Sequence, residues 1–115
     1  MGVMRVMVAH SLLSYRQTIS AVLKELRPHL KIFSTDPEDL DAEFRRLSPQ
    51  LVVCSRVTEV VEREALGWIE LYPDPVSSES VVSLDGEKVI YPQMDLDALL
   101  SILDEAERLY KAIKK

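Results

Sequence analysis

Apolar residues in this chain form short unbroken runs that alternate with segments of helical periodicity. The runs lack the two-residue alternation of half-exposed strands, so they predict strands that are buried on both faces. They lie at residues 3–9, 30–34, 51–55 and 68–72. Between them, apolar residues recur at three- and four-residue spacing, which predicts helices near 12–26, 36–47 and 57–66. Strands that alternate with helices in this way predict a parallel sheet with helices on both faces.

The last third of the chain breaks this alternation. Residues 73–80 have no helical period, and Asp85-Gly86 separates two β-rich segments, 81–84 and 88–91. This dipeptide is a strong hairpin signal. A parallel return usually needs a crossover of about a dozen residues or more. We therefore expect the strand at 68–72 and the two hairpin strands to form an antiparallel meander at the end of the sheet.

Capping residues mark the start of two predicted helices. Asp36 is placed as an N-cap, with Pro37 at the first helical position. Asp95 is the expected cap of a long amphipathic helix that closes the chain.

Size and composition are those of one globular domain that spans residues 1–115. Hydrophobic residues make up 47% of the chain and charged residues 29%, which are ordinary globular values. Cys54 is the one cysteine, so an internal disulfide is excluded, as is usual in a reducing compartment. The apolar runs are far too short to span a bilayer. We expect a cytoplasmic protein that does not act at a membrane.

The net charge of −5 comes from residues 51–115, where thirteen acidic residues outnumber seven basic ones. Nucleic-acid binding depends on a basic stripe that neutralises phosphates, and the one basic cluster here is the Lys-rich end of the last helix. We therefore expect no nucleic-acid partner.

Three segments of the chain resemble the receiver domain of bacterial response regulators. They are MRVMVAHSLLSYRQTISAVLKEL near the start, the stretch from LRPHLKIFSTD to LSPQLVVCS, and KVIYPQMDLDALLSILDEA near the end. The resemblance implies a flavodoxin-like, three-layer α/β/α fold with a mostly parallel sheet of order 2-1-3-4. The C-terminal hairpin at 81–91 then takes the place of the family's fourth helix.

The residues that carry the family's chemistry are replaced in this chain. His10 and Ser11 stand where the family has the acidic pair that binds Mg²⁺, and Ser55 stands where it has the phosphorylated aspartate. Tyr91 occupies the position of the lysine that contacts the phosphoryl group. Phosphoryl transfer to aspartate needs the carboxylate, a hard cation on oxygen ligands and a compensating positive charge. We therefore expect a degenerate receiver that is not an enzyme and uses no metal or cofactor.

Four polar residues nevertheless follow neighbouring strands. They are His10, Ser11, Ser55 and Arg56. In a sheet of order 2-1-3-4 they end strands one and three, at the switch point where such folds bind ligands. An imidazole, two hydroxyls and a guanidinium could hold a small anion there, and the alternative is that they cap loops or face water.

Cys54, on the third strand, is either a reactive thiol beside Arg56 or a small buried hydrophobe, and free cysteines are more often buried. Acidic runs at the helix starts suit the helix dipole and lack the loop spacing of a calcium site.

Two functions follow from these observations. The first is a signalling or scaffold module that binds a protein, including a second copy of itself. The alternative is a sensor of small anionic ligands, or a weak enzyme, that uses the strand-end residues. Because sheet edges without protection pair with other chains, we expect a homodimer whose interface includes residues 73–91. The candidate edge residues are Val81, Val82, Val89 and Ile90.

Overall fold

The computed structural model describes residues 3–71 and 79–114, and within them it contains one six-stranded sheet of order β2-β1-β3-β4-β5-β6. The strands are β1 (Arg5–Ala9), β2 (Lys31–Ser34), β3 (Leu51–Cys54), β4 (Gly67–Glu70), β5 (Ser80–Leu84) and β6 (Glu87–Tyr91). The helices are α1 (Leu13–Leu26), α2 (Leu40–Leu47), α3 (Glu59–Glu64) and α4 (Leu96–Lys114). Tyr72 and residues 73–78, expected to end a strand and form a polar loop, lie outside the described residues.

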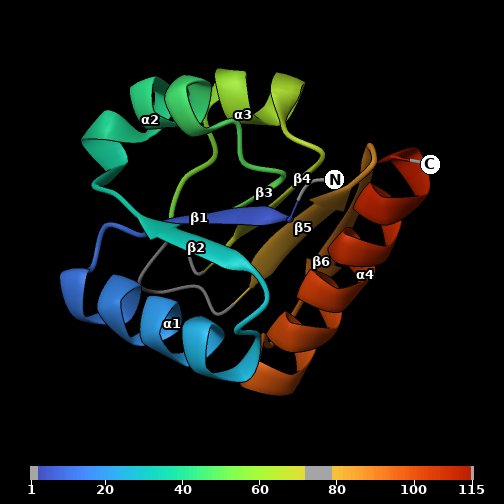
Figure 1. The fold of residues 1–115 in the computed structure, drawn as a ribbon. Coiled ribbons are helices and arrows are strands. Elements are labelled where there is room, and N and C mark those ends of the chain that lie inside the picture. Colours follow the sequence, from blue (N-terminus) through green and yellow to red (C-terminus); the bar gives the residue numbers. More distant parts are fainter. Residues whose placement is uncertain (1–2, 72–78, 115) are drawn as a thin grey trace.

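Helices cover both faces of the sheet, as the hydrophobic pattern predicted (Figure 1). Successive residues of β1 and β3 point to opposite faces, and both faces are buried. Val6, Val8 and Val53 belong to the core that α1 and α4 complete, whereas Met7 and Val52 belong to the core under α2 and α3. The predicted three-layer α/β/α architecture with parallel order 2-1-3-4 is therefore confirmed.

The meander at the end of the sheet is confirmed as well. Strand β4 pairs with β5, and β5 with β6, both in antiparallel orientation. Asp85 and Gly86 both have positive φ angles, 51° and 87°, which is the backbone of the two-residue turn that joins strands with right-handed twist. Gly67 lets β4 and β5 approach closely, because a Cβ there would lie 2.9 Å from the carbonyl oxygen of Ser83.

The two predicted helix caps have different outcomes. The carboxylate of Asp95 accepts a hydrogen bond of 2.8 Å from the backbone N–H of Ala98, so it caps α4 as expected. Pro37 begins a short 3-10 turn, Pro37–Asp39, and α2 begins only at Leu40. Asp36 precedes that turn without a side-chain capping bond. Its carboxylate instead pairs with the guanidinium of Arg16 at 2.9 Å, because the 3-10 turn separates it from α2.

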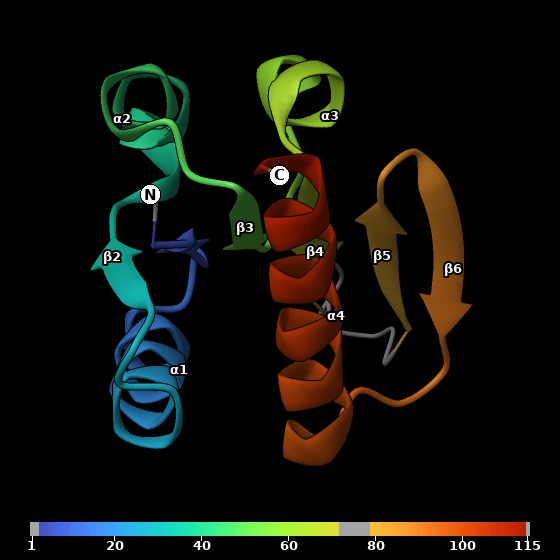
Figure 2. The same ribbon diagram turned by 45° about the vertical axis from the view of Figure 1, so that its right-hand side comes forward.

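Strands β5 and β6 extend beyond the part of the sheet that α2 and α3 cover (Figure 2). Helix α4 lies on the other face of the sheet, opposite to α2 and α3. On the α2–α3 side, the ammonium group of Lys88 lies 5.8 Å from the ring centroid of Trp68 and 2.9 Å from a carboxylate oxygen of Glu62. Lys88 thus covers part of Trp68, whose side chain also belongs to the core under α2 and α3. Within the described residues, no helix is long and apolar enough to cross a membrane.

Candidate functional site

The carboxyl ends of β1 and β3 lie side by side, as the predicted strand order required. Ala9 of β1 is the register partner of Cys54 of β3, so His10 and Ser55 follow at the same edge of the sheet. The backbone N–H of Ser11 donates a hydrogen bond of 3.0 Å to the hydroxyl oxygen of Ser55. The structure thus joins two of the predicted site residues directly.

His10 is buried and has a protein partner for each ring nitrogen. Its Nδ1 accepts a hydrogen bond of 3.1 Å from the backbone N–H of Leu12, so this nitrogen carries no proton. Its Nε2 lies 3.2 Å from the carbonyl oxygen of Leu71, an acceptor, so Nε2 donates. This pattern fits only the neutral ring. Burial lowers the pKa of His10 below its usual 6.5, against the raising effect of the Leu71 carbonyl, and the nearby Arg16 cation lowers it further.

The other members of the predicted group differ in exposure. Ser55 is buried, whereas Ser11 and Arg56 are exposed. Strand β3 ends at Cys54, and the chain bends at Ser55 and Arg56, so Arg56 does not continue the strand's alternation of faces. The site is therefore a compact His10–Ser11–Ser55 centre, and the exposed Arg56 directly follows it in the chain.

Two charged residues that the sequence did not single out complete this edge. The guanidinium of Arg16 donates to the carbonyl oxygen of His10 at 3.2 Å and pairs with Asp36, which ties the ends of β1 and β2 together. A carboxylate oxygen of Glu70 accepts a hydrogen bond of 2.8 Å from the backbone N–H of Val57, which anchors the loop after β3. The one sequence signal for Arg16 was its place in the first turn of the first helix.

Cys54 is a core residue and not a surface thiol. Its side chain has no exposed surface and lies in the core under α2 and α3. Burial raises the pKa of its thiol to about 12, with a further contribution from the charge of Glu70. A thiol with this pKa is protonated at neutral pH, so it is a poor nucleophile.

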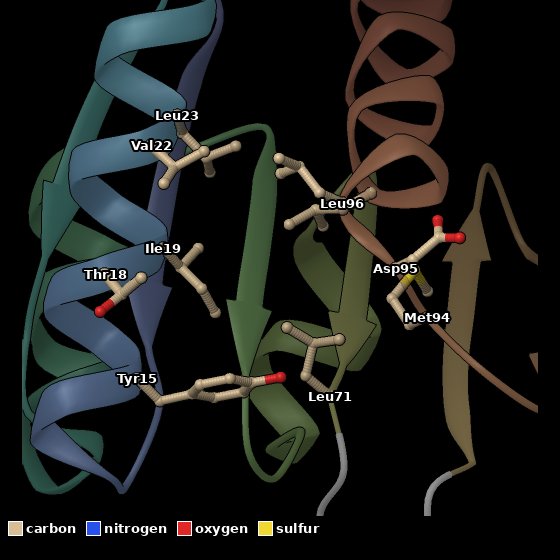
Figure 3. A pocket seen from close by; sticks show the side chains of 10 residues that line it. Tyr15, Thr18, Ile19, Val22, Leu23, Leu71, Met94, Asp95 and Leu96 are labelled. Carbon is tan, nitrogen blue, oxygen red and sulfur yellow. The ribbon is translucent and has the colours of Figure 1, made fainter.

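An apolar hollow of about 220 Å³ lies between α1 and the start of α4, next to the polar centre. Tyr15, Ile19 and Val22 approach it from α1, and Met94, Asp95 and Leu96 lie across from them (Figure 3). Leu71, which follows β4, lies between the two sides. The ring of Tyr15 meets the ring of His10 edge-on, with centroids 4.7 Å apart and planes at 74°. His10 thus contacts two of the residues that line the hollow, Tyr15 and Leu71.

The described residues contain no group of three or more His, Cys, Asp or Glu side chains placed to hold a metal ion. At the end of β1, the neutral His10 has the guanidinium of Arg16 beside it. A guanidinium next to a neutral imidazole disfavours a bound cation by charge.

The candidate dimer residues divide into exposed and buried members. Val89 is 51% exposed and Ile90 is 62% exposed, both on the outer strand β6. Val82 is 3% exposed, because its side chain lies in the core beneath α4, and Val81 is half-buried. Val82 is therefore not a surface residue, and the apolar exposure at the edge comes from Val89 and Ile90.

Comparison of the chain with protein-family models, with curated proteins and with solved structures finds no match.

Proposed function

We propose that this protein is a receiver-like signalling module that is not phosphorylated and acts by binding other proteins. The observation that carries the proposal is the chemistry at the carboxyl ends of β1 and β3. A neutral His10 has both ring nitrogens engaged in the protein, and Ser55 accepts a hydrogen bond from Ser11. Transfer of a phosphoryl group to aspartate needs carboxylates and a divalent cation at this edge.

The position of Tyr91 supports the same conclusion. Tyr91 ends β6, and two strands, β4 and β5, separate β6 from β3. In a five-strand receiver sheet, one strand separates the last strand from the third. Here two strands separate them, and because neighbouring strands lie about 4.8 Å apart, the end of β6 is farther from β3 by about that distance. Even a lysine at position 91 would therefore start farther from Ser55 than the family's lysine does from its aspartate.

The test is incubation with acetyl phosphate and Mg²⁺, followed by intact-mass measurement. We expect the 13.1 kDa chain to keep its mass. Ser55→Ala is the matched control variant. A stoichiometric phosphoryl adduct on the wild-type chain that is missing from Ser55→Ala would place phosphorylation at this edge and refute the proposal.

The alternative function, an anion sensor, has one supporting observation: Arg56 is exposed and directly follows Ser55, whose hydroxyl oxygen accepts the Ser11 N–H. A bound anion would stabilise the folded protein in proportion to its occupancy. If the alternative holds, millimolar sulfate raises the melting temperature above a chloride control of equal ionic strength. Arg56→Ala then removes this gain, and Arg45→Ala, at an exposed site on α2, keeps it. The proposed function predicts no sulfate-specific gain in any of the three proteins.

A further inference from the structure

Strand β6 forms an outer edge of the sheet, paired on one side with β5 (Figure 2). Its middle residues, Val89 and Ile90, are among the most exposed large apolar side chains of the described residues, at 51% and 62%. An outer strand presents backbone N–H and C=O groups that another strand can pair with.

The alternation of backbone hydrogen bonds along the hairpin identifies the backbone groups of β6 that point away from the sheet. The backbone N–H of Asp85 donates to the carbonyl oxygen of Leu66 at 2.9 Å, so it faces toward β4. Backbone groups alternate in direction along a strand, so those of Leu84, Val82 and Ser80 face β6. Their register partners on β6 are Glu87, Val89 and Tyr91. It follows that the backbone groups of Lys88 and Ile90 point away from the sheet.

The usual protection of an edge strand is weak here. Lysine side chains on an edge discourage pairing with another chain. Lys88 is the one lysine of β6, but its ammonium group is held by Glu62 of α3 and lies over Trp68. Pro92 follows the strand and does not interrupt it. The middle of β6 is therefore available for pairing.

We infer that two copies of this chain associate through antiparallel pairing of β6 with β6, with Val89 of one copy opposite Val89 of the other. The inference deepens the proposed protein-binding function by naming the partner as a second copy. In this register, Lys88 of each copy faces Ile90 of the other. Both residues have outward backbone groups, so the two pairs exchange four hydrogen bonds. The Val89 side chains then meet at the two-fold axis, on the α4 side of the joined sheet.

Neighbouring registers are less favourable. A two-residue shift in one direction places Lys88 opposite Lys88, and like charges directly opposite each other destabilise a sheet. The same shift in the other direction places Lys88 opposite Pro92, which has no N–H to donate. Odd shifts put side chains of opposite faces against each other. The chosen register also sets Glu87 opposite Tyr91, so no like charges face each other.

The dimer is expected to be weak, because one five-residue strand pair buries less surface than a permanent interface. We expect dissociation in the micromolar range. Sedimentation velocity from about 1 to 500 μM should show mass rising from 13.1 kDa toward twice that value.

The decisive variant is Ile90→Pro. It removes the outward N–H and leaves the pairing of β6 with β5 in place, since proline is tolerated on an edge strand whose N–H faces solvent. We expect its dissociation constant to rise by about 30-fold or more, because two of the four intermolecular bonds are lost. Ser34→Pro is the matched control. On the opposite edge strand β2, Lys31 and Thr35 donate to β1, so the N–H of Ser34 points outward as well. This control should dimerise like the wild type.

Hydrogen exchange of the wild-type chain tests the register without any substitution. The amides of Lys88 and Ile90 should gain protection as the concentration rises, whereas that of Val89, bonded to β5, should be protected throughout. A monomeric mass at 500 μM, unchanged dimerisation of a folded Ile90→Pro, or concentration-independent exchange at Lys88 and Ile90 would each overturn the inference. A monomer that acquires no phosphoryl adduct would refute the dimer alone, and a dimer that acquires one would refute the proposed function alone.

Discussion

Replacement of His10 by phenylalanine tests whether the polar centre has a structural role. His10→Phe keeps an aromatic ring beside Tyr15 but removes both ring nitrogens, so the N–H of Leu12 and the carbonyl of Leu71 lose their partners. A buried polar group without a partner costs about 1–3 kcal/mol. Leu12 lies near solvent, and water can replace part of its bond. We expect the free energy of unfolding to fall by about 2–4 kcal/mol at pH 7.5.

The same variant should also change the pH dependence of stability. The pKa of His10 is lowered in the folded protein, so the unfolded chain binds the proton more readily. The stabilising effect of the neutral ring is therefore fully present above pH 6.5 and is lost as the pH falls toward the folded pKa. Solvent near Ser11 and Leu12 screens part of this effect, and we expect a loss of about 0.5–1 kcal/mol between pH 7.5 and 5.5. This difference should be missing from His10→Phe.

Urea denaturation at the two pH values measures both effects. His29→Phe is the control, because His29 lies exposed at the surface, with Nε2 3.0 Å from a carboxylate oxygen of Glu107. A surface pair of this kind contributes about 0–1 kcal/mol, so His29→Phe should stay close to the wild type at pH 7.5. The reasoning fails if His10→Phe has the wild-type unfolding free energy at pH 7.5, or if it loses as much stability as the wild type at pH 5.5.

Two further predictions concern the core. Iodoacetamide should label Cys54 slowly in the native protein and fast in urea, because the thiol is buried with a pKa of about 12; rapid native labelling would revive a reactive thiol. Gly67→Ala should lower the unfolding free energy by about 1–3 kcal/mol, because the new methyl group would meet the side chain of Leu84 and the carbonyl of Ser83. An unchanged melting temperature would contradict the close approach of β4 and β5.

The fold was predictable because its main determinants are local. Unbroken apolar runs are typical of strands buried on both faces, and β1 and β3 are such strands. Asp85-Gly86 predicted the turn, because both residues adopt the positive φ angles that a two-residue hairpin loop needs. The cap of α4 followed in the same way from Asp95. These signals depend on a few neighbouring residues and little on the rest of the molecule.

The site was less predictable because its contacts join distant parts of the chain. Strand order predicted that His10 and Ser55 would share an edge. It could not predict that the partner of His10 would be the backbone carbonyl of Leu71, which carries no side-chain signature. The exposure of Arg56 was equally hidden, because the chain bends after Cys54 and leaves the strand's alternation of faces.

The hairpin strands posed a different problem. Val81 and Val82 are both apolar, so alternation alone did not reveal which of them lies beneath α4. The packing of α4 on one face of β5 determines that Val82 is the buried residue.

The meander adds strands to the sheet without changing the direction of the last one. Strand β5 runs against β4, and β6 runs against β5, so the two reversals return the chain to the direction of the parallel strands. In a parallel unit, a crossover helix on one face of the sheet brings the chain back so that the next strand can run parallel to the first. Here the antiparallel strand β5 has that role within the sheet itself. The helix that follows β6 consequently begins at the same edge as α1, where both border the apolar hollow. A meander of this kind therefore adds a strand to one edge of a domain, while the final strand–helix unit keeps the orientation that it would have after a helical crossover.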